Sequence, residues 1–98
     1  MSVLVLFDAH YQPDRADEVI QAFAAALPAT RAFDGCLEVS VQQDQDDPGH
    51  IVLVERWASR EHHKAYMAWR TGEGATGSDV GTLMTARPTI TYFDDAGI

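Results

Sequence analysis

The sequence is poor in basic residues, and the few it has are spread out. Lysine and arginine together number seven against fifteen acidic residues, which gives a formal net charge of −8 at pH 7. Because the basic residues are scattered along the chain, no cluster of them can neutralise a run of phosphates. The composition therefore excludes nucleic acid and an anionic membrane surface as expected partners.

Cysteine is nearly absent as well. Cys36 is the only one, which excludes a disulfide within the chain and fits a reducing compartment, so we expect a cytoplasmic protein. A reactive thiol needs exposure and a lowered pKa, and no base adjoins Cys36 in the sequence. We therefore interpret Cys36 as a small packing residue.

A long hydrophobic run is missing too. The apolar stretch 3–10 is too short to span a bilayer and has no basic residues before it, so it is predicted to be a strand and not a signal peptide or anchor. Hydrophobic residues make up 46% of the 98 residues and charged residues 22%, as in one ordinary globular domain. We predict a single domain over residues 1–98.

Apolar periodicity predicts two helices and four strands. Pro28 is expected to interrupt the first helix, because it donates no N–H and clashes with the preceding turn. Gly35 is expected to supply a left-handed cap, and Ser59 an N-cap for the second helix. The predicted strands are 3–10, 37–43, 51–57 and 89–93, and the predicted helices are 14–33 and 60–70. The second helix is followed by a glycine-rich loop (71–77), which we interpret as a lid, and by a short helix from Ser78 to Met84.

The order β-α-β-β-α-β is that of the ferredoxin-like folds in the α+β class. Such folds have an antiparallel sheet with both main helices on one face. The first and third predicted strands are apolar on both sides, so the other face of the sheet should be covered too. Since a chain of this size buries less than about three-quarters of its unfolded surface, we predict a homodimer in which two sheets meet face to face.

Several segments resemble the antibiotic biosynthesis monooxygenase (ABM) superfamily, and together they cover nearly the whole chain. They are the first strand, the helix end Phe33-Asp34-Gly35-Cys36, the turn Asp47-Pro48-Gly49, the strand from Val52 to Trp57 with Ala58-Ser59, and the helix with Tyr66-Met67-Ala68-Trp69-Arg70. The resemblance implies a dimeric ferredoxin-like α/β barrel. Relatives include quinol and anthrone monooxygenases, haem-degrading enzymes and a signal-molecule isomerase, and fold alone cannot choose among these.

The resemblance implies a cofactor-independent monooxygenase that oxidises an electron-rich polycyclic phenol, anthrone or quinol with O₂. Because the substrate itself supplies the reducing electrons, no cofactor is expected. Several oxygenases of the superfamily pair the strand-end Trp with an Asn and a helical His. This chain has no Asn, and Tyr66 stands at the helical position. Two alternatives therefore stay open: a non-catalytic ligand-binding or dimerisation module, and an isomerase of a small carbonyl metabolite.

The candidate site residues lie around the end of the third predicted strand. His62, Tyr66 and Trp69 have the spacing of one helix face, and we expect that face to meet Trp57. Trp57 and Trp69 would bind a flat aromatic substrate. His62 is the first-choice base, because its unperturbed pKa suits neutral pH, and Tyr66 is the second catalytic candidate. The alternative is that these aromatic side chains form ordinary core, and His63 is expected at the surface.

Three further residues are candidates for binding the substrate. Asp8 and His10 lie on one face of the first predicted strand, where they could form an acid–base pair. Arg87 precedes the last strand and could bind an oxyanion through two hydrogen bonds, although a solvated arginine is the simpler interpretation.

No metal site is expected from the histidine spacing. His62 and His63 are adjacent, so their side chains diverge on a helix. His10 and His50 lie at opposite ends of predicted strands, and neither belongs to a motif with metal-ligand spacing.

Overall fold

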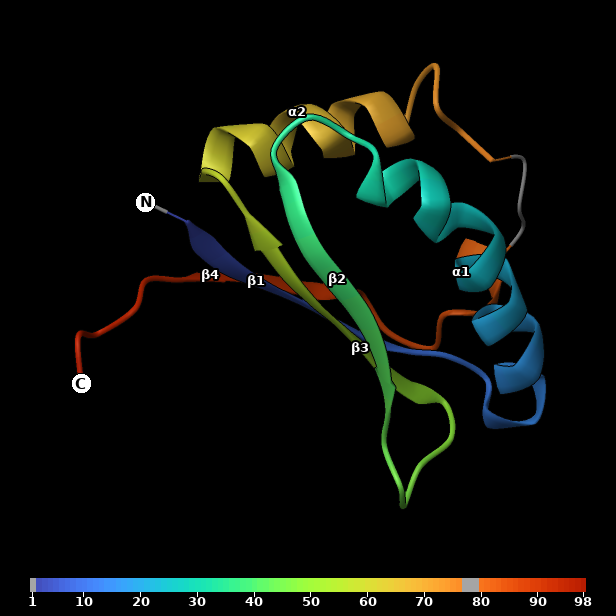
Figure 1. Ribbon diagram of the computed structural model, residues 1–98. Coiled ribbons are helices and arrows are strands. Elements are labelled where there is room, and N and C mark those ends of the chain that lie inside the picture. The colour runs from blue at the N-terminus through green and yellow to red at the C-terminus, as the bar shows by residue number, and fades with distance from the viewer. Residues whose placement is uncertain (1, 77–79) are drawn as a thin grey trace.

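The computed structural model describes residues 2–76 and 80–98. Four strands form one antiparallel sheet, and two α-helices lie on one side of it (Figure 1). The elements in chain order are β1 (Val3–His10), the 3₁₀ helix η1 (Pro13–Arg15), α1 (Ala16–Arg31), β2 (Cys36–Gln43), β3 (His50–Trp57), α2 (Arg60–Arg70), the 3₁₀ helix η2 (Val80–Leu83) and β4 (Thr89–Phe93). The predicted α+β, ferredoxin-like fold is confirmed.

One helix differs from its prediction. α1 runs through Pro28 to Arg31 without interruption. Pro28 lies in the last turn of α1, so its missing N–H costs the helix one bond near its end instead of breaking its middle. The expected cap at Ser78 lies outside the described residues. In the described part of the chain, no helix is both long and apolar enough to cross a membrane.

The strand register decides which side chains face the helices. The sheet order is β2-β3-β1-β4, and β1 pairs with β3 from Val3 opposite Trp57 to His10 opposite His50. Since side chains alternate along a strand, the odd-numbered residues of both strands face the helices. Val5 and Ile51 are accordingly fully buried.

The core between the sheet and the helices has two parts. Under α1, Ala9, Val19 and Ile51 belong to a buried cluster with aliphatic neighbours. Under α2, the cluster contains Val3, Val5, Trp57 and Tyr66, with Phe33 packed against it. Both tryptophans of the chain lie at the α2 end, since Trp69 also packs against this second cluster.

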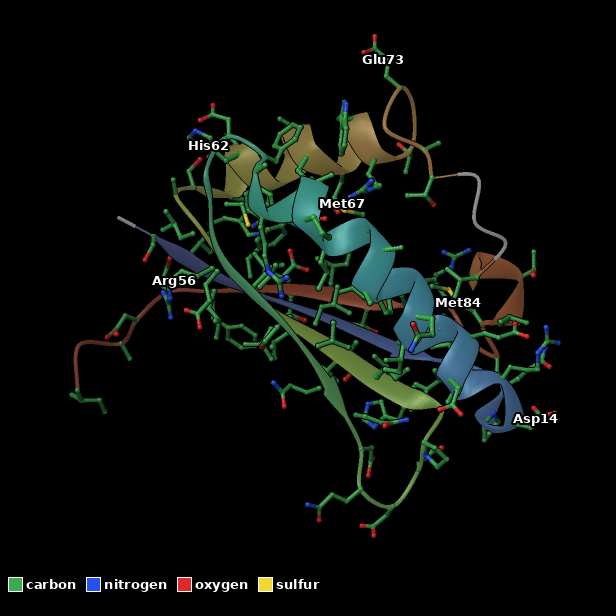
Figure 2. All side chains as sticks on the ribbon, turned by 45° about the vertical axis from the view of Figure 1, so that its right-hand side comes forward. Asp14, Arg56, His62, Met67, Glu73 and Met84 are labelled. Carbon is green, nitrogen blue, oxygen red and sulfur yellow. The ribbon has the colours of Figure 1, made fainter. Side chains whose placement is uncertain are left out.

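The opposite face of the sheet carries no helix in the described chain. Its centre is made of the even-numbered, partly buried residues Leu4, Leu6, Val52 and Val54. Arg56 also lies on this side (Figure 2), where its guanidinium donates to the Ser2 hydroxyl at 3.1 Å. We call this surface the open face.

Candidate active site

A cavity of about 200 Å³ lies between the helices and the sheet. Most of the side chains around it are apolar, namely Phe7, Ala22, Phe23, Ala26, Leu27, Leu53, Met67 and Val80. The polar residues that line it are Thr30, Glu55, Tyr66, Arg70 and Thr76. An apolar cavity with a few converging polar groups is the usual form of a small-molecule site.

Glu55 places a buried carboxylate at the wall of this cavity. Its side chain extends from β3 toward the helices, and the residue is 4% exposed. The indole Nε1 of Trp57 donates a 2.8 Å hydrogen bond to Oε1 of Glu55. Burial raises the pKa of Glu55, and the Trp57 hydrogen bond opposes part of that rise. A carboxylate with a raised pKa is a stronger base than an exposed one.

Glu55 was not among the predicted site residues, although the sequence contained a signal for it. It occupies the same strand face as Ile51, Leu53 and Trp57, all of which are buried. A carboxylate within an inward-facing row needs a hydrogen-bonding partner or a function.

The hydroxyl of Tyr66 is held in place by two neighbours. It lies 2.7 Å from Oγ1 of Thr30 on α1, and Nε of Arg70 donates to it at 3.1 Å. The Arg70 guanidinium also donates to Thr30 Oγ1 at 2.8 Å and to the carbonyl oxygens of Ala26 and Gly74 at 3.0 and 3.1 Å. The network fixes the phenol at the cavity wall and ties α2 to α1.

Trp57 and Trp69 meet Tyr66 as predicted, but neither lines the cavity. The ring of Trp57 is fully buried, 5.1 Å from that of Tyr66 between centroids. Trp69 lies 6.1 Å from Tyr66, with the Arg70 guanidinium 4.8 Å above its ring. The ring of Phe33 packs against all three. Trp57 therefore influences the cavity indirectly: it donates a hydrogen bond to Glu55, which lines the cavity.

The two neighbouring histidines exchange their predicted places. His63 is 1% exposed and packs edge-on against Trp57, so the prediction that it lies at the surface is wrong. Its Nδ1 is 2.7 Å from the Tyr92 hydroxyl. Its Nε2 has no hydrogen-bond partner in the described chain, with Oε1 of Glu55 at 3.8 Å. Burial lowers the pKa of His63.

His62 lies in the first turn of α2, outside the set of residues that line the cavity (Figure 2). Its Nδ1 is 2.6 Å from the hydroxyl of Ser59, and its ring covers Gly35. Gly35 has a φ of 88°, as predicted for a left-handed cap. The expectation that His62 meets Trp57 is wrong, because α2 turns positions 63 and 66 inward. A catalytic role for His62 stays a prediction.

The remaining predicted binding residues lie away from the cavity. Asp8 and His10 are on the open face, where the imidazole Nε2 of His50 is 2.8 Å from Oδ1 of Asp8. Arg87 is exposed, in the segment between η2 and β4. A ligand inside the cavity cannot contact Asp8 or His10, since the sheet separates them from it.

Comparisons with known proteins agree with this fold. A family model described as antibiotic biosynthesis monooxygenase matches residues 2–71. A crystal structure of an antibiotic biosynthesis monooxygenase is similar with a TM-score of 0.80 at 23% identity, over 95% of this chain and 97% of that one. A conserved protein from Methanosarcina mazei Go1 gives a TM-score of 0.81 at 13% identity, over 95% and 91%. Rv0793 from Mycobacterium tuberculosis gives 0.69 at 28% identity, over 98% and 99%. No curated protein matches significantly.

Proposed function

Because this chain belongs to the antibiotic biosynthesis monooxygenase family, we propose that it oxidises an electron-rich phenol, anthrone or quinol with O₂ inside the cavity. The observation that carries the proposal is the pairing of a buried carboxylate, Glu55, with the fixed hydroxyl of Tyr66 in one apolar space. The first can take a proton from a bound phenol, and the second can orient it.

The size of the cavity narrows the substrate class. Its volume of about 200 Å³ lies below the roughly 300–1,000 Å³ of sites for drug-sized ligands. An apolar cavity of about 150 Å³ is enough to bind benzene. We therefore propose a substrate with one or two rings, such as a hydroquinone, in preference to a three-ring anthrone.

Glu55 is proposed to begin the reaction by accepting the phenolic proton. A phenol has an ordinary pKa of about 10, so a carboxylate whose pKa is raised by burial faces a smaller gap than an exposed one. The guanidinium of Arg70 and the hydroxyl of Tyr66 at the cavity wall favour the phenolate that forms, because charge–charge and hydrogen-bond interactions are stronger beside a mostly apolar wall than in bulk water.

The electrons for O₂ come from the substrate. The phenolate passes one electron to O₂, which leaves a phenoxyl radical and superoxide. These combine at a ring carbon to form a peroxide anion, which takes back the proton held by Glu55. This ring carbon must carry a hydrogen: cleavage of the O–O bond releases the outer oxygen, which leaves as water with the C–H proton, and the carbon becomes a quinone carbonyl. One oxygen atom enters the product and the other leaves as water, so substrate and O₂ balance quinone and water.

Oxygen uptake by metal-stripped protein tests this proposal with a panel of hydroquinones, naphthohydroquinones and anthrones. We expect Glu55→Gln to slow uptake by about 10²–10⁴-fold, the usual contribution of a general base. The matched control is Glu61→Gln, which makes the same change at an exposed position on α2 and should keep full activity.

Other outcomes would point to the other functions. Uptake that is lost in His62→Ala but kept in Glu55→Gln would return the role of base to His62. Saturable binding of the panel without uptake would indicate a ligand-binding module. Conversion of a carbonyl compound without O₂ would indicate an isomerase.

A further inference from the structure

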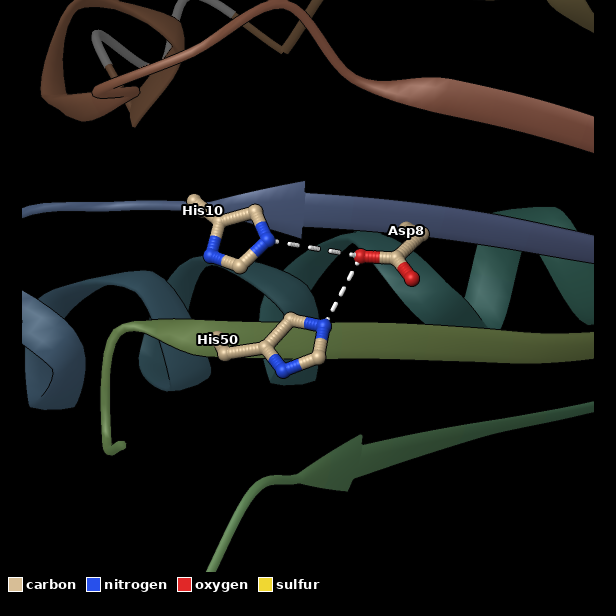
Figure 3. A group of neighbouring side chains, drawn as sticks. All are labelled: Asp8, His10 and His50. Carbon is tan, nitrogen blue, oxygen red and sulfur yellow. Dashed lines mark hydrogen bonds and ion pairs between the residues drawn. The ribbon is translucent and has the colours of Figure 1, made fainter. Parts of the chain in front are cut away.

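Three side chains that chelate metals in other proteins meet at one end of the open face. Antiparallel pairing places His10 directly opposite His50, although the two lie forty residues apart in the sequence. Asp8 precedes His10 by two residues on β1, so it extends to the same face. Figure 3 shows the three side chains together, with α1 behind the strands. The sequence interpretation missed this group because it treated the two strand ends separately.

Their spacing is close to that of a metal site. Oδ1 of Asp8 is 2.8 Å from Nε2 of His50 and 3.8 Å from Nε2 of His10, and the three ligand atoms lie within 4.8 Å of one another. In a tetrahedral zinc site with bonds of about 2.0–2.1 Å, ligand atoms are about 3.3 Å apart. The separations of Asp8 from His50 and from His10 differ from this value by about half an ångström each.

One ring must turn before both histidines can share an ion. The imidazoles of His10 and His50 are stacked, 4.3 Å apart and within 6° of parallel, whereas a ligand nitrogen directs its lone pair in the ring plane. The His10 side chain is 46% exposed, so rotation about its Cβ–Cγ bond meets little obstruction.

A further carboxylate orients His50. Oδ2 of Asp44 lies 2.8 Å from Nδ1 of His50. A histidine that binds a metal through one ring nitrogen usually donates its other N–H to a carboxylate of this kind. With the proton on Nδ1, Nε2 directs a lone pair toward the Asp8 oxygen at 2.8 Å. A bound ion would take the place of the proton that Nε2 donates to Asp8 when Nε2 is protonated.

We propose that Asp8, His10 and His50 bind a divalent transition-metal ion, with Asp44 orienting His50. Two imidazoles and one carboxylate suit Zn²⁺, Co²⁺ or Ni²⁺ better than Ca²⁺ or Mg²⁺, which prefer oxygen ligands. Three protein ligands leave a position for water. The site lies across the sheet from the cavity, so it is independent of the proposed oxidation.

Calorimetric titration of tag-free, metal-stripped protein with Zn²⁺ tests the site, and the absorption spectrum of the Co²⁺ form reports its ligand geometry. We expect one ion per chain in the wild type and no saturable binding in His10→Ala, His50→Ala or Asp8→Asn. Asp44→Asn should weaken binding by about 10–100-fold, as for other residues that orient a metal ligand.

The matched control is His62→Ala, which removes a histidine from α2 and should bind Zn²⁺ like the wild type. His10→Ala changes an exposed residue at a strand end, so it keeps the test decisive even if His50→Ala fails to fold. The proposal is overturned if the wild type shows no saturable binding, or if His10→Ala binds as well as the wild type. Loss of binding in His62→Ala would also overturn it, because the ion would then lie elsewhere.

Discussion

At the scale of single residues, the proposed oxidation depends on how Glu55 is held. Its carboxylate is buried, accepts a hydrogen bond from Trp57 at 2.8 Å and lies 3.8 Å from Nε2 of His63, an atom with no hydrogen-bond partner among the described residues. Burial raises the pKa of Glu55 and lowers that of His63. Both shifts favour the uncharged forms, so the proposed base is the ionised form of Glu55, which binds a proton more tightly than an exposed carboxylate does.

The raised pKa of Glu55 predicts how stability depends on pH. The folded state binds this proton more tightly than the unfolded state. The resulting contribution to stability is therefore full below the ordinary value of 4.5 and is lost as the pH rises through the folded pKa. We expect the wild type to lose stability relative to Glu55→Gln from about pH 4.5 upward, measured by urea unfolding. Parallel stability curves for the two proteins would contradict the shift.

The N–H of Trp57, and not only its ring, is predicted to contribute to stability and to set the pKa of Glu55. Trp57→Phe removes the donor to Glu55 and leaves a buried acceptor unsatisfied, which should lower the free energy of unfolding by about 1–3 kcal/mol. It should also raise the pKa of Glu55 further, which moves the pH dependence of oxygen uptake upward. Trp69→Phe is the control, since Trp69 makes no hydrogen bond to Glu55 among the described contacts. Equal effects of the two changes would contradict this role.

At the scale of elements, the position of α2 decides which side chains reach the cavity. Ser59 caps the helix, because its hydroxyl accepts a 3.1 Å hydrogen bond from the N–H of His62. At the other end of α2, Tyr66 and Arg70 bond to Thr30 on α1. The helix is therefore fixed at both ends, by its own cap and by its neighbour.

Removal of the cap should cost stability in a way that another capping residue restores. Ser59→Ala should lower the free energy of unfolding by about 1 kcal/mol, and Ser59→Asp should recover most of it. Chemical denaturation measures both. If Ser59→Ala unfolds like the wild type, the hydrogen bond to the N–H of His62 contributes nothing to the helix.

The sequence predicted the elements well and the contacts between them less well. Alternation and helical spacing placed β1, α2 and β4 at their observed bounds. The same spacing fits both 62/66/69 and 63/66/70 on one face of α2, so it could not decide which histidine is buried. His63 is buried because it contacts Trp57, on the preceding strand, and Tyr92, which lies 29 residues further along the chain. The meeting of His10 with His50 likewise depends on strand pairing, which periodicity does not reveal.

At the scale of the whole molecule, the open face presents apolar side chains that a protein partner could bury. Leu4, Leu6, Val52 and Val54 form its apolar centre, and Phe93, opposite Leu4 on β4, is 42% exposed. Exposed apolar surface of this kind marks an interaction site. We propose that a second copy of the chain covers this apolar centre, sheet against sheet, and leaves the end with Asp8 and His10 uncovered.

Light scattering coupled to size-exclusion chromatography tests the dimer. The wild type should elute as a dimer and Leu6→Asp as a monomer, because a charge at the centre of an apolar interface is costly to bury. Ala25→Asp, which places the same charge on the exposed side of α1, should stay dimeric. A monomeric wild type, or a dimeric Leu6→Asp, would show that this face is not the interface.

The central claim is that the cavity inserts one atom of O₂ into a bound phenol with Glu55 as the base. A single-turnover reaction under isotope-labelled O₂, followed by mass spectrometry of product and water, tests it most directly. We predict one labelled atom in the quinone and one in water for the wild type and Glu61→Gln, and a much slower appearance of both in Glu55→Gln. Unlabelled product, or labelled product formed equally fast by Glu55→Gln, would contradict the claim.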